Sequence, residues 1–136
     1  MIEMSETKSP VEYGKFFDKV LKLDENIRFV AIYDGQLNAK FKEGIHGYLK
    51  EDETKLSLSE AQKRWAFRKK LSFKIGEPKF AMAEYAKVNR ITFPLGNDGI
   101  ILVTTELGID VSKLVDKIIE ICYSINKDLL SGFYTR

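Results

Sequence analysis

The two side chains best suited to nucleophilic chemistry occur once each, as His46 and Cys122. A histidine can activate a cysteine when the two side chains lie within hydrogen-bonding distance. His46 falls in a glycine-containing loop, whereas Cys122 falls on the apolar stripe of an expected helix, where a free cysteine behaves as a small hydrophobe. Reactive cysteines need an exposed, electropositive setting. We therefore predict a structural role for Cys122 and no catalytic dyad.

The acidic residues are arranged as turn and capping groups rather than as a catalytic pair. The runs Asp24-Glu25 and Glu51-Asp52-Glu53 are both local, and no pattern places two carboxylates across a cleft. The stretch 96–99, GNDG, is a hairpin turn that lacks the lysine and following helix of a phosphate-binding loop. A single cysteine excludes a multi-cysteine metal site. We expect no enzymatic activity, no metal and no cofactor.

The most unusual stretch is 61–76, AQKRWAFRKKLSFKIG, which contains three aromatic residues and no acid. Its basic residues form a candidate basic surface: Lys63, Arg64, Arg68, Lys69, Lys70 and Lys74. Basic side chains contact phosphates and aromatic rings stack on bases, so nucleic-acid binding is one interpretation. However, the three aromatic residues do not share a helix face, and an acidic run lies just upstream. Nucleic-acid binding is therefore kept only as a second alternative.

The overall composition is that of one ordinary globular domain. The chain has 136 residues, of which 44% are hydrophobic and 31% charged, and its net charge is +2. The N-terminus has no apolar signal core, and no apolar run approaches the about 20 residues that span a bilayer. We expect a cytoplasmic protein without a membrane partner, with a disordered tail at 1–8, one domain at 9–126 and a C-terminal tail at 127–136.

Hydrophobic periodicity and turn signals predict the element order α-β-β-α-β-β-β-α. The first helix is expected to begin at the capping residue Ser9 and to end near Leu23. The middle helix is expected to begin between Thr54 and Ser59 and to end at Gly76, and the last helix is expected to follow Asp110. The strands are expected at 27–33, 36–42, 79–86, 90–95 and 99–105.

The apolar patterns also predict the order of the strands. The first and fifth strands are apolar on both faces, so both should be central, whereas the second has outward lysines typical of an edge. Strands joined by short turns should pair. These conditions give an α+β fold: a three-layer α/β/α sandwich on a five-stranded, mostly antiparallel sheet of order 2-1-5-4-3, with the middle helix alone on one face.

This pattern, from about Ser9 to Ile125, resembles the roadblock/LC7 family and its longin and profilin-like relatives. The segments IGEPKFAM and FPLGNDGIILVT are also similar to those of small uncharacterised archaeal proteins of this shape. The resemblance implies a non-catalytic module that often forms a homodimer through its middle helix and the adjoining edge strand. It also implies binding of small GTPases, motor subunits or signalling partners.

The middle helix carries two apolar stripes, where a simple surface helix carries one. Leu58, Ala61 and Trp65 form the first stripe, and Phe67, Leu71 and Ile75 form the second. One stripe should face the sheet, and the other should face a partner or the loop at 43–54. The neighbouring edge strand has few outward charges and so invites pairing. We predict a homodimer with these candidate interface residues: Trp65, Phe67, Leu71, Phe80 and Met82.

Glu84 suggests an alternative function for the same fold, a small-ligand sensor with PAS-like strand order. Glu84 shares a strand face with Phe80 and Met82, so on a core face it would need a partner such as Arg28 or Arg90. A mostly apolar pocket around such a charged group is the general form of a ligand site. Our main hypothesis remains a homodimeric scaffold or interaction module for a signalling partner such as a small GTPase.

Overall fold

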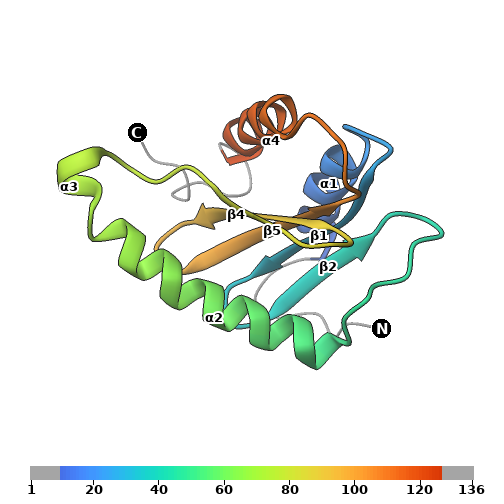
Figure 1. Ribbon diagram of the computed structural model, residues 1–136, viewed down its shortest axis with the longest axis horizontal. Coiled ribbons are helices and arrows are strands. Elements are labelled where there is room, and N and C mark those ends of the chain that lie inside the picture. The colour runs from blue at the N-terminus through green and yellow to red at the C-terminus, as the bar shows by residue number, and fades with distance from the viewer. Residues whose placement is uncertain (1–9, 127–136) are drawn as a thin grey trace.

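The computed structural model describes residues 10–126 and confirms the predicted architecture (Figure 1). Helices α1 (Pro10–Leu21) and α4 (Val111–Asn126) cover one face of the sheet, and α2 (Glu51–Lys69) covers the other. The cap Ser9 and the expected tails at 1–8 and 127–136 lie outside the described residues. No helix within the described part of the chain is long and apolar enough to cross a membrane.

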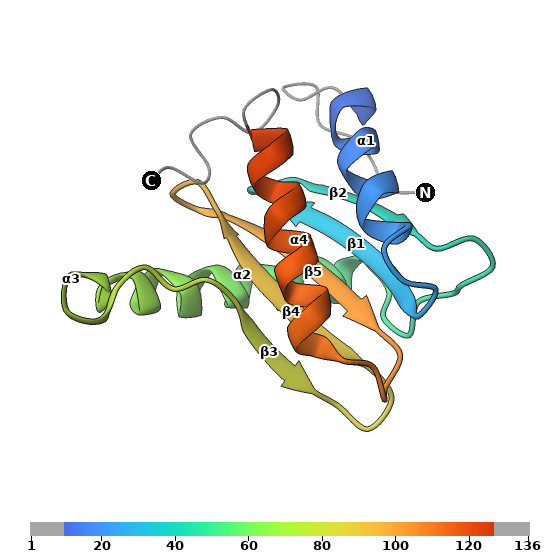
Figure 2. The same cartoon turned by 90° about the horizontal axis from the view of Figure 1, so that it is seen from above.

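The sheet has the predicted order β2-β1-β5-β4-β3, and every neighbouring pair is antiparallel (Figure 2). Its strands are β1 (Ile27–Tyr33), β2 (Leu37–Phe41), β3 (Ala81–Glu84), β4 (Asn89–Leu95) and β5 (Gly99–Thr105). The central position of β1 and β5 follows from their apolar sequences, which bury side chains on both faces. Pro94 lies beyond the residues of β4 that pair with β3, so its missing N–H leaves that ladder intact.

Two apolar clusters hold the layers together. The larger cluster packs α1 and α4 onto the sheet and includes Phe16, Ile118 and Cys122. The smaller cluster, under α2, includes Leu58 and Trp65. The predicted stripe of α4 therefore faces the core as expected, up to Cys122, beyond which the side chain of Ile125 lies outside the described part.

The middle helix begins earlier and ends earlier than its sequence predicted. Glu51, Asp52 and Glu53 form its first turn, where the helix dipole favours negative charge. The Glu53 carboxylate also accepts a hydrogen bond from the backbone N–H of Lys50 at 2.8 Å. The helix ends at Lys69, and a separate turn of helix, α3 (Ser72–Ile75), ends at Gly76, whose φ of 94° suits glycine.

The edge strands differ from prediction in detail. β3 covers only Ala81–Glu84, half of the expected range. Lys40 on β2 pairs with Asp18 at 2.6 Å, and the ammonium of Lys42, the residue after β2, donates to the carbonyls of Leu21 and Asp24, at and just after the end of α1. Asn38, two residues before Lys40 and so on the same strand face as that outward lysine, is fully buried, and Phe41 is partly exposed beside Phe29.

Candidate interaction surface

The two stripes of the middle helix have opposite environments. Leu58, Ala61 and Trp65 are buried against the sheet. The first stripe is therefore the one that faces the sheet, which the sequence left open. The Trp65 indole N–H donates a hydrogen bond of 2.9 Å to the hydroxyl of Thr92 on β4. Trp65 is therefore a core residue of the single chain and is wrong as an interface candidate.

The second stripe does not pack under the loop at 43–54, which was the alternative explanation for it. Phe67 is 63% exposed, Leu71 is 44% exposed and Ile75 is 79% exposed. Phe73, on the short helix α3, is 81% exposed. These four exposed side chains lie between the last turn of α2 and the end of α3, and we call them the helical apolar surface.

Phe80 and Met82 lie on the opposite face of the sheet from the helical apolar surface. Met82 is the cross-strand partner of Ile91, which belongs to the cluster under α1 and α4. The Phe80 ring lies 6.4 Å from that of Phe93 in the same cluster. Both side chains remain about two-fifths exposed. Exposed apolar side chains thus lie beside the edge strand β3 on the face covered by α1 and α4. The exposed end of α2 lies on the opposite face of the sheet.

The six residues of the candidate basic surface make different contacts. Lys63 pairs with Glu60 at 3.2 Å, and the Arg68 guanidinium lies 5.3 Å from the centre of the Trp65 ring. Lys69 donates to the carbonyls of Gly96 and Asn97 in the β4–β5 turn. The Lys74 ammonium lies over the Phe73 ring. Arg64 lines a groove described below, and Lys70 follows the last residue of α2. The structure assigns no shared contact to all six.

The candidate nucleophile and base lie on different sides of the sheet. Cys122 is buried in the cluster under α1 and α4. His46 is exposed in the loop before α2, and its backbone carbonyl accepts a hydrogen bond from Arg28. Within the described residues, no three His, Cys, Asp or Glu side chains are grouped as a metal site requires.

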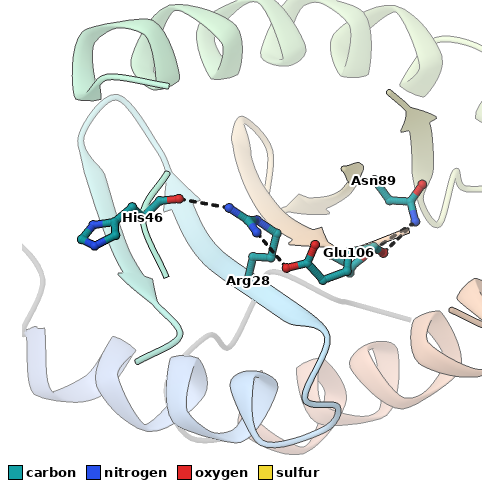
Figure 3. A network of polar contacts seen from close by, with 5 residues as sticks. Arg28, His46, Asn89 and Glu106 are labelled. Atoms are coloured by element: carbon teal, nitrogen blue, oxygen red, sulfur yellow. Dashed lines mark hydrogen bonds and ion pairs between the residues drawn. The ribbon is translucent and has the colours of Figure 1, made fainter. Parts of the chain in front are cut away.

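Arg28 forms a polar network that the sequence did not reveal (Figure 3). Its Nη1 lies 2.7 Å from Oε2 of Glu106, and its Nη2 donates to the carbonyl of His46 at 3.0 Å. Glu106 directly follows β5, and its backbone carbonyl accepts a hydrogen bond from the Asn89 side chain. The network links the loop before α2 to the ends of β4 and β5.

Glu84 is exposed, so it does not need the buried partner that its strand face suggested. Arg28 pairs with Glu106, and Arg90 donates to the hydroxyl of Ser57 at 2.8 Å. The prediction of a pocket centred on Glu84 is therefore wrong. A hollow does lie close by, between α2 and the β3–β4 turn, and it includes Arg90.

The layers, strand order and helix placement define a roadblock-like fold, and solved structures share it. A roadblock/LC7 domain from Streptomyces avermitilis has a TM-score of 0.63 at 10% identity, over 83% of this chain and 93% of that one. The gliding protein MglB from Thermus thermophilus has a TM-score of 0.65 at 12% identity, over 93% and 96%. A structure described as MglB with tetrameric arrangement has a TM-score of 0.59 at 12% identity, over 91% and 96%.

No protein-family model matches the sequence, and no curated protein matches it either. The similarity to roadblock structures is thus one of fold, at identities of 10–12% in these three comparisons. It confirms the resemblance that the order of helices and strands had suggested. Partner and activity have to be argued from the surface of this chain.

Proposed function

We propose that the protein is a non-catalytic, cytoplasmic interaction module that works as a homodimer and serves as a scaffold or regulator for a signalling partner such as a small GTPase. The observation that carries this proposal is the helical apolar surface beside an unpaired strand edge. A contiguous exposed apolar patch on a small domain marks an interaction site more often than scattered single residues do.

The edge strand β3 supports pairing between two copies. Its four residues, AMAE, include one charged side chain, Glu84. An edge strand presents backbone N–H and C=O groups with which another strand can pair. Antiparallel pairing of two β3 strands about a two-fold axis would bring the helical apolar surfaces and the Phe80–Met82 pairs of both copies toward that axis.

The signalling partner is proposed from the fold and not from a site. The roadblock resemblance implies small GTPases and signalling proteins as partners, and a structure of similar fold forms a tetrameric assembly. A dimer would present the α1 and α4 layers of both copies outward, which leaves surface for a second protein. Fold similarity alone does not assign that partner.

The experiment that tests the proposal is sedimentation of the wild-type protein and of a double variant, Phe67→Lys with Leu71→Lys. Two charges on the helical apolar surface should abolish association, since burying unpaired ammonium groups is strongly unfavourable. Leu107→Lys is the matched control, because Leu107 is an exposed apolar residue in the loop after β5. A wild-type monomer at micromolar concentration would contradict the proposal.

A further inference from the structure

A groove of about 540 Å³ runs between α2, the loop before it and the β3–β4 turn. On α2 it is lined by Ser57, Glu60 and Arg64, whereas the helical apolar surface begins at Phe67. Its volume is within the range of about 300–1,000 Å³ that is usual for small-molecule sites. Its lining includes Tyr48, Leu49, Glu60, Arg64, Tyr85 and Arg90.

The groove has more positive than negative charge. Arg64, Lys87 and Arg90 line it, and Glu60 is the acidic residue among its lining groups. Glu60 already pairs with Lys63 on the same helix, at 3.2 Å. The walls therefore present three cations whose charge is not balanced within the groove, which favours an anionic ligand.

Among these cations, Arg90 gives the strongest support for an anionic ligand. Its Nη2 donates to the neutral hydroxyl of Ser57 at 2.8 Å, and no carboxylate in the described part of the chain forms an ion pair with it. Burial lowers the pKa of Arg90, the positive charge of Arg64 lowers it further, and Tyr85 opposes these effects. A largely buried guanidinium without a counter-charge is costly, and a bound anion would supply the charge that is missing.

The remaining walls suit a flat apolar body. Tyr85 is 56% exposed, and Leu49 is also exposed. The Tyr48 ring has the Arg28 guanidinium 4.8 Å from its centre and the Lys87 ammonium 5.0 Å from it. Cations over aromatic faces are stabilised there, so these contacts hold the Tyr48 ring in the wall of the groove.

We propose that this groove binds a small organic anion, with a carboxylate or phosphate group on Arg90 and Arg64 and an apolar ring against Tyr85 and Leu49. The planar guanidinium groups can each donate two parallel hydrogen bonds to such an anionic group. This site uses none of the residues of the helical apolar surface, although Tyr85 directly follows β3, the strand proposed to pair in the dimer.

Amide chemical shifts measured by NMR during titration test the site. The probes are sodium benzoate and phenyl phosphate, with benzyl alcohol as the uncharged counterpart. Saturable shifts confined to residues near 57–64 and 85–90 are expected with an anion and not with benzyl alcohol. The stronger of the two anions identifies the preferred head group. If neither anion saturates these shifts by about 10 mM, the proposal is wrong.

Two substitutions test the roles of the cations separately. Arg64→Gln changes an exposed residue, and Arg90→Gln changes a partly buried one; each should weaken the better probe about tenfold or more. Lys117→Gln, on the exposed side of α4, is the matched control and should leave binding unchanged. Unchanged affinity in a folded Arg64→Gln variant would overturn the proposal. Sedimentation of the same samples reports the dimer independently, so failure of one proposal is distinguishable from failure of the other.

Discussion

Nη1 of Arg28 lies 2.7 Å from Oε2 of Glu106, and this ion pair joins residues 78 positions apart in the chain. The side chain of Arg28 is 11% exposed, whereas that of Glu106 is 41% exposed. The guanidinium is thus the desolvated partner, and it depends on Glu106 and on the His46 carbonyl for its hydrogen bonds. Through its hydrogen bond to the His46 carbonyl, Arg28 also holds the loop before α2 against the sheet, next to the proposed anion groove.

Glu106→Ala should lower the free energy of unfolding by about 1–3 kcal/mol, because it leaves a buried guanidinium short of a partner. The matched control is Asp18→Ala, which breaks the Lys40–Asp18 pair, whose two side chains are each about half exposed. That change should cost about 0–1 kcal/mol, as for other surface ion pairs. Urea denaturation measures both. Equal losses of unfolding free energy in the two variants would contradict the expectation that the Arg28–Glu106 pair stabilises the fold more than the Lys40–Asp18 pair does.

Trp65→Ala should destabilise the protein by about 3–5 kcal/mol, because it removes a large core side chain and its hydrogen bond to Thr92. Leu56→Ala, on the exposed side of the same helix, should change stability by about 0.5 kcal/mol at most. Chemical denaturation of the two variants compares the faces of α2. A small effect at Trp65 would mean that α2 does not pack on the sheet as described.

Two glycines should respond to alanine in opposite directions. Gly14 lies in α1, and a Cβ added there meets no atom within 4 Å outside its own helix, so Gly14→Ala should stabilise by about 0.5–1 kcal/mol. A Cβ on Gly99 would lie 2.7 Å from the backbone oxygen of Leu95, so Gly99→Ala should cost about 1–3 kcal/mol. Thermal unfolding measures whether each substitution raises or lowers stability. A change in the same direction for both variants would contradict the geometry of the β4–β5 turn.

Lys69 ties the end of α2 to the β4–β5 turn, and Lys69→Met should lower stability by about 1–3 kcal/mol. Burial lowers the pKa of Lys69, while Asp98 and Glu77 oppose the shift. The folded state therefore releases this proton at a lower pH than the unfolded state, whose value is about 10.5. The contribution of Lys69 to stability should rise with pH in the window just below that value.

Unfolding measured from neutral to alkaline pH checks this dependence. The stability difference between wild type and Lys69→Met should grow as pH approaches the unfolded pKa. Lys70→Met is the control, since Lys70 is exposed beyond the last residue of α2. A difference between wild type and Lys69→Met that shrinks with pH would show that the charged ammonium is the stabilising form at the turn.

The sheet could be predicted because its signals are local. The range 27–33 is apolar on both faces and the turns at 34–36 and 96–98 contain glycine, so strand positions and neighbours followed. The burial of Leu58, Ala61 and Trp65 also followed from helical spacing. The start of α2 did not, because Glu51, Asp52 and Glu53 look like a polar loop until the helix dipole is considered.

The site was less predictable because it depends on contacts between distant parts of the chain. Trp65 and Phe67 are both large aromatic residues. Only the rotation of α2 about its axis, relative to the sheet, determines that Trp65 is in the core and Phe67 is on the surface. Phe80 and Met82 share a face with Ile91, which places them opposite α2, and this required the strand register. The Arg28–Glu106 pair arises across neighbouring strands, which no local pattern indicates.

The most direct test of the central claim is sedimentation velocity of the untagged protein over a range of micromolar concentrations. The homodimer proposal predicts a species with twice the mass of one chain, reduced to a single-chain species by Phe67→Lys with Leu71→Lys and retained in Leu107→Lys. A wild-type protein that sediments as a single chain throughout, or a double variant that remains dimeric, would contradict the proposed interface.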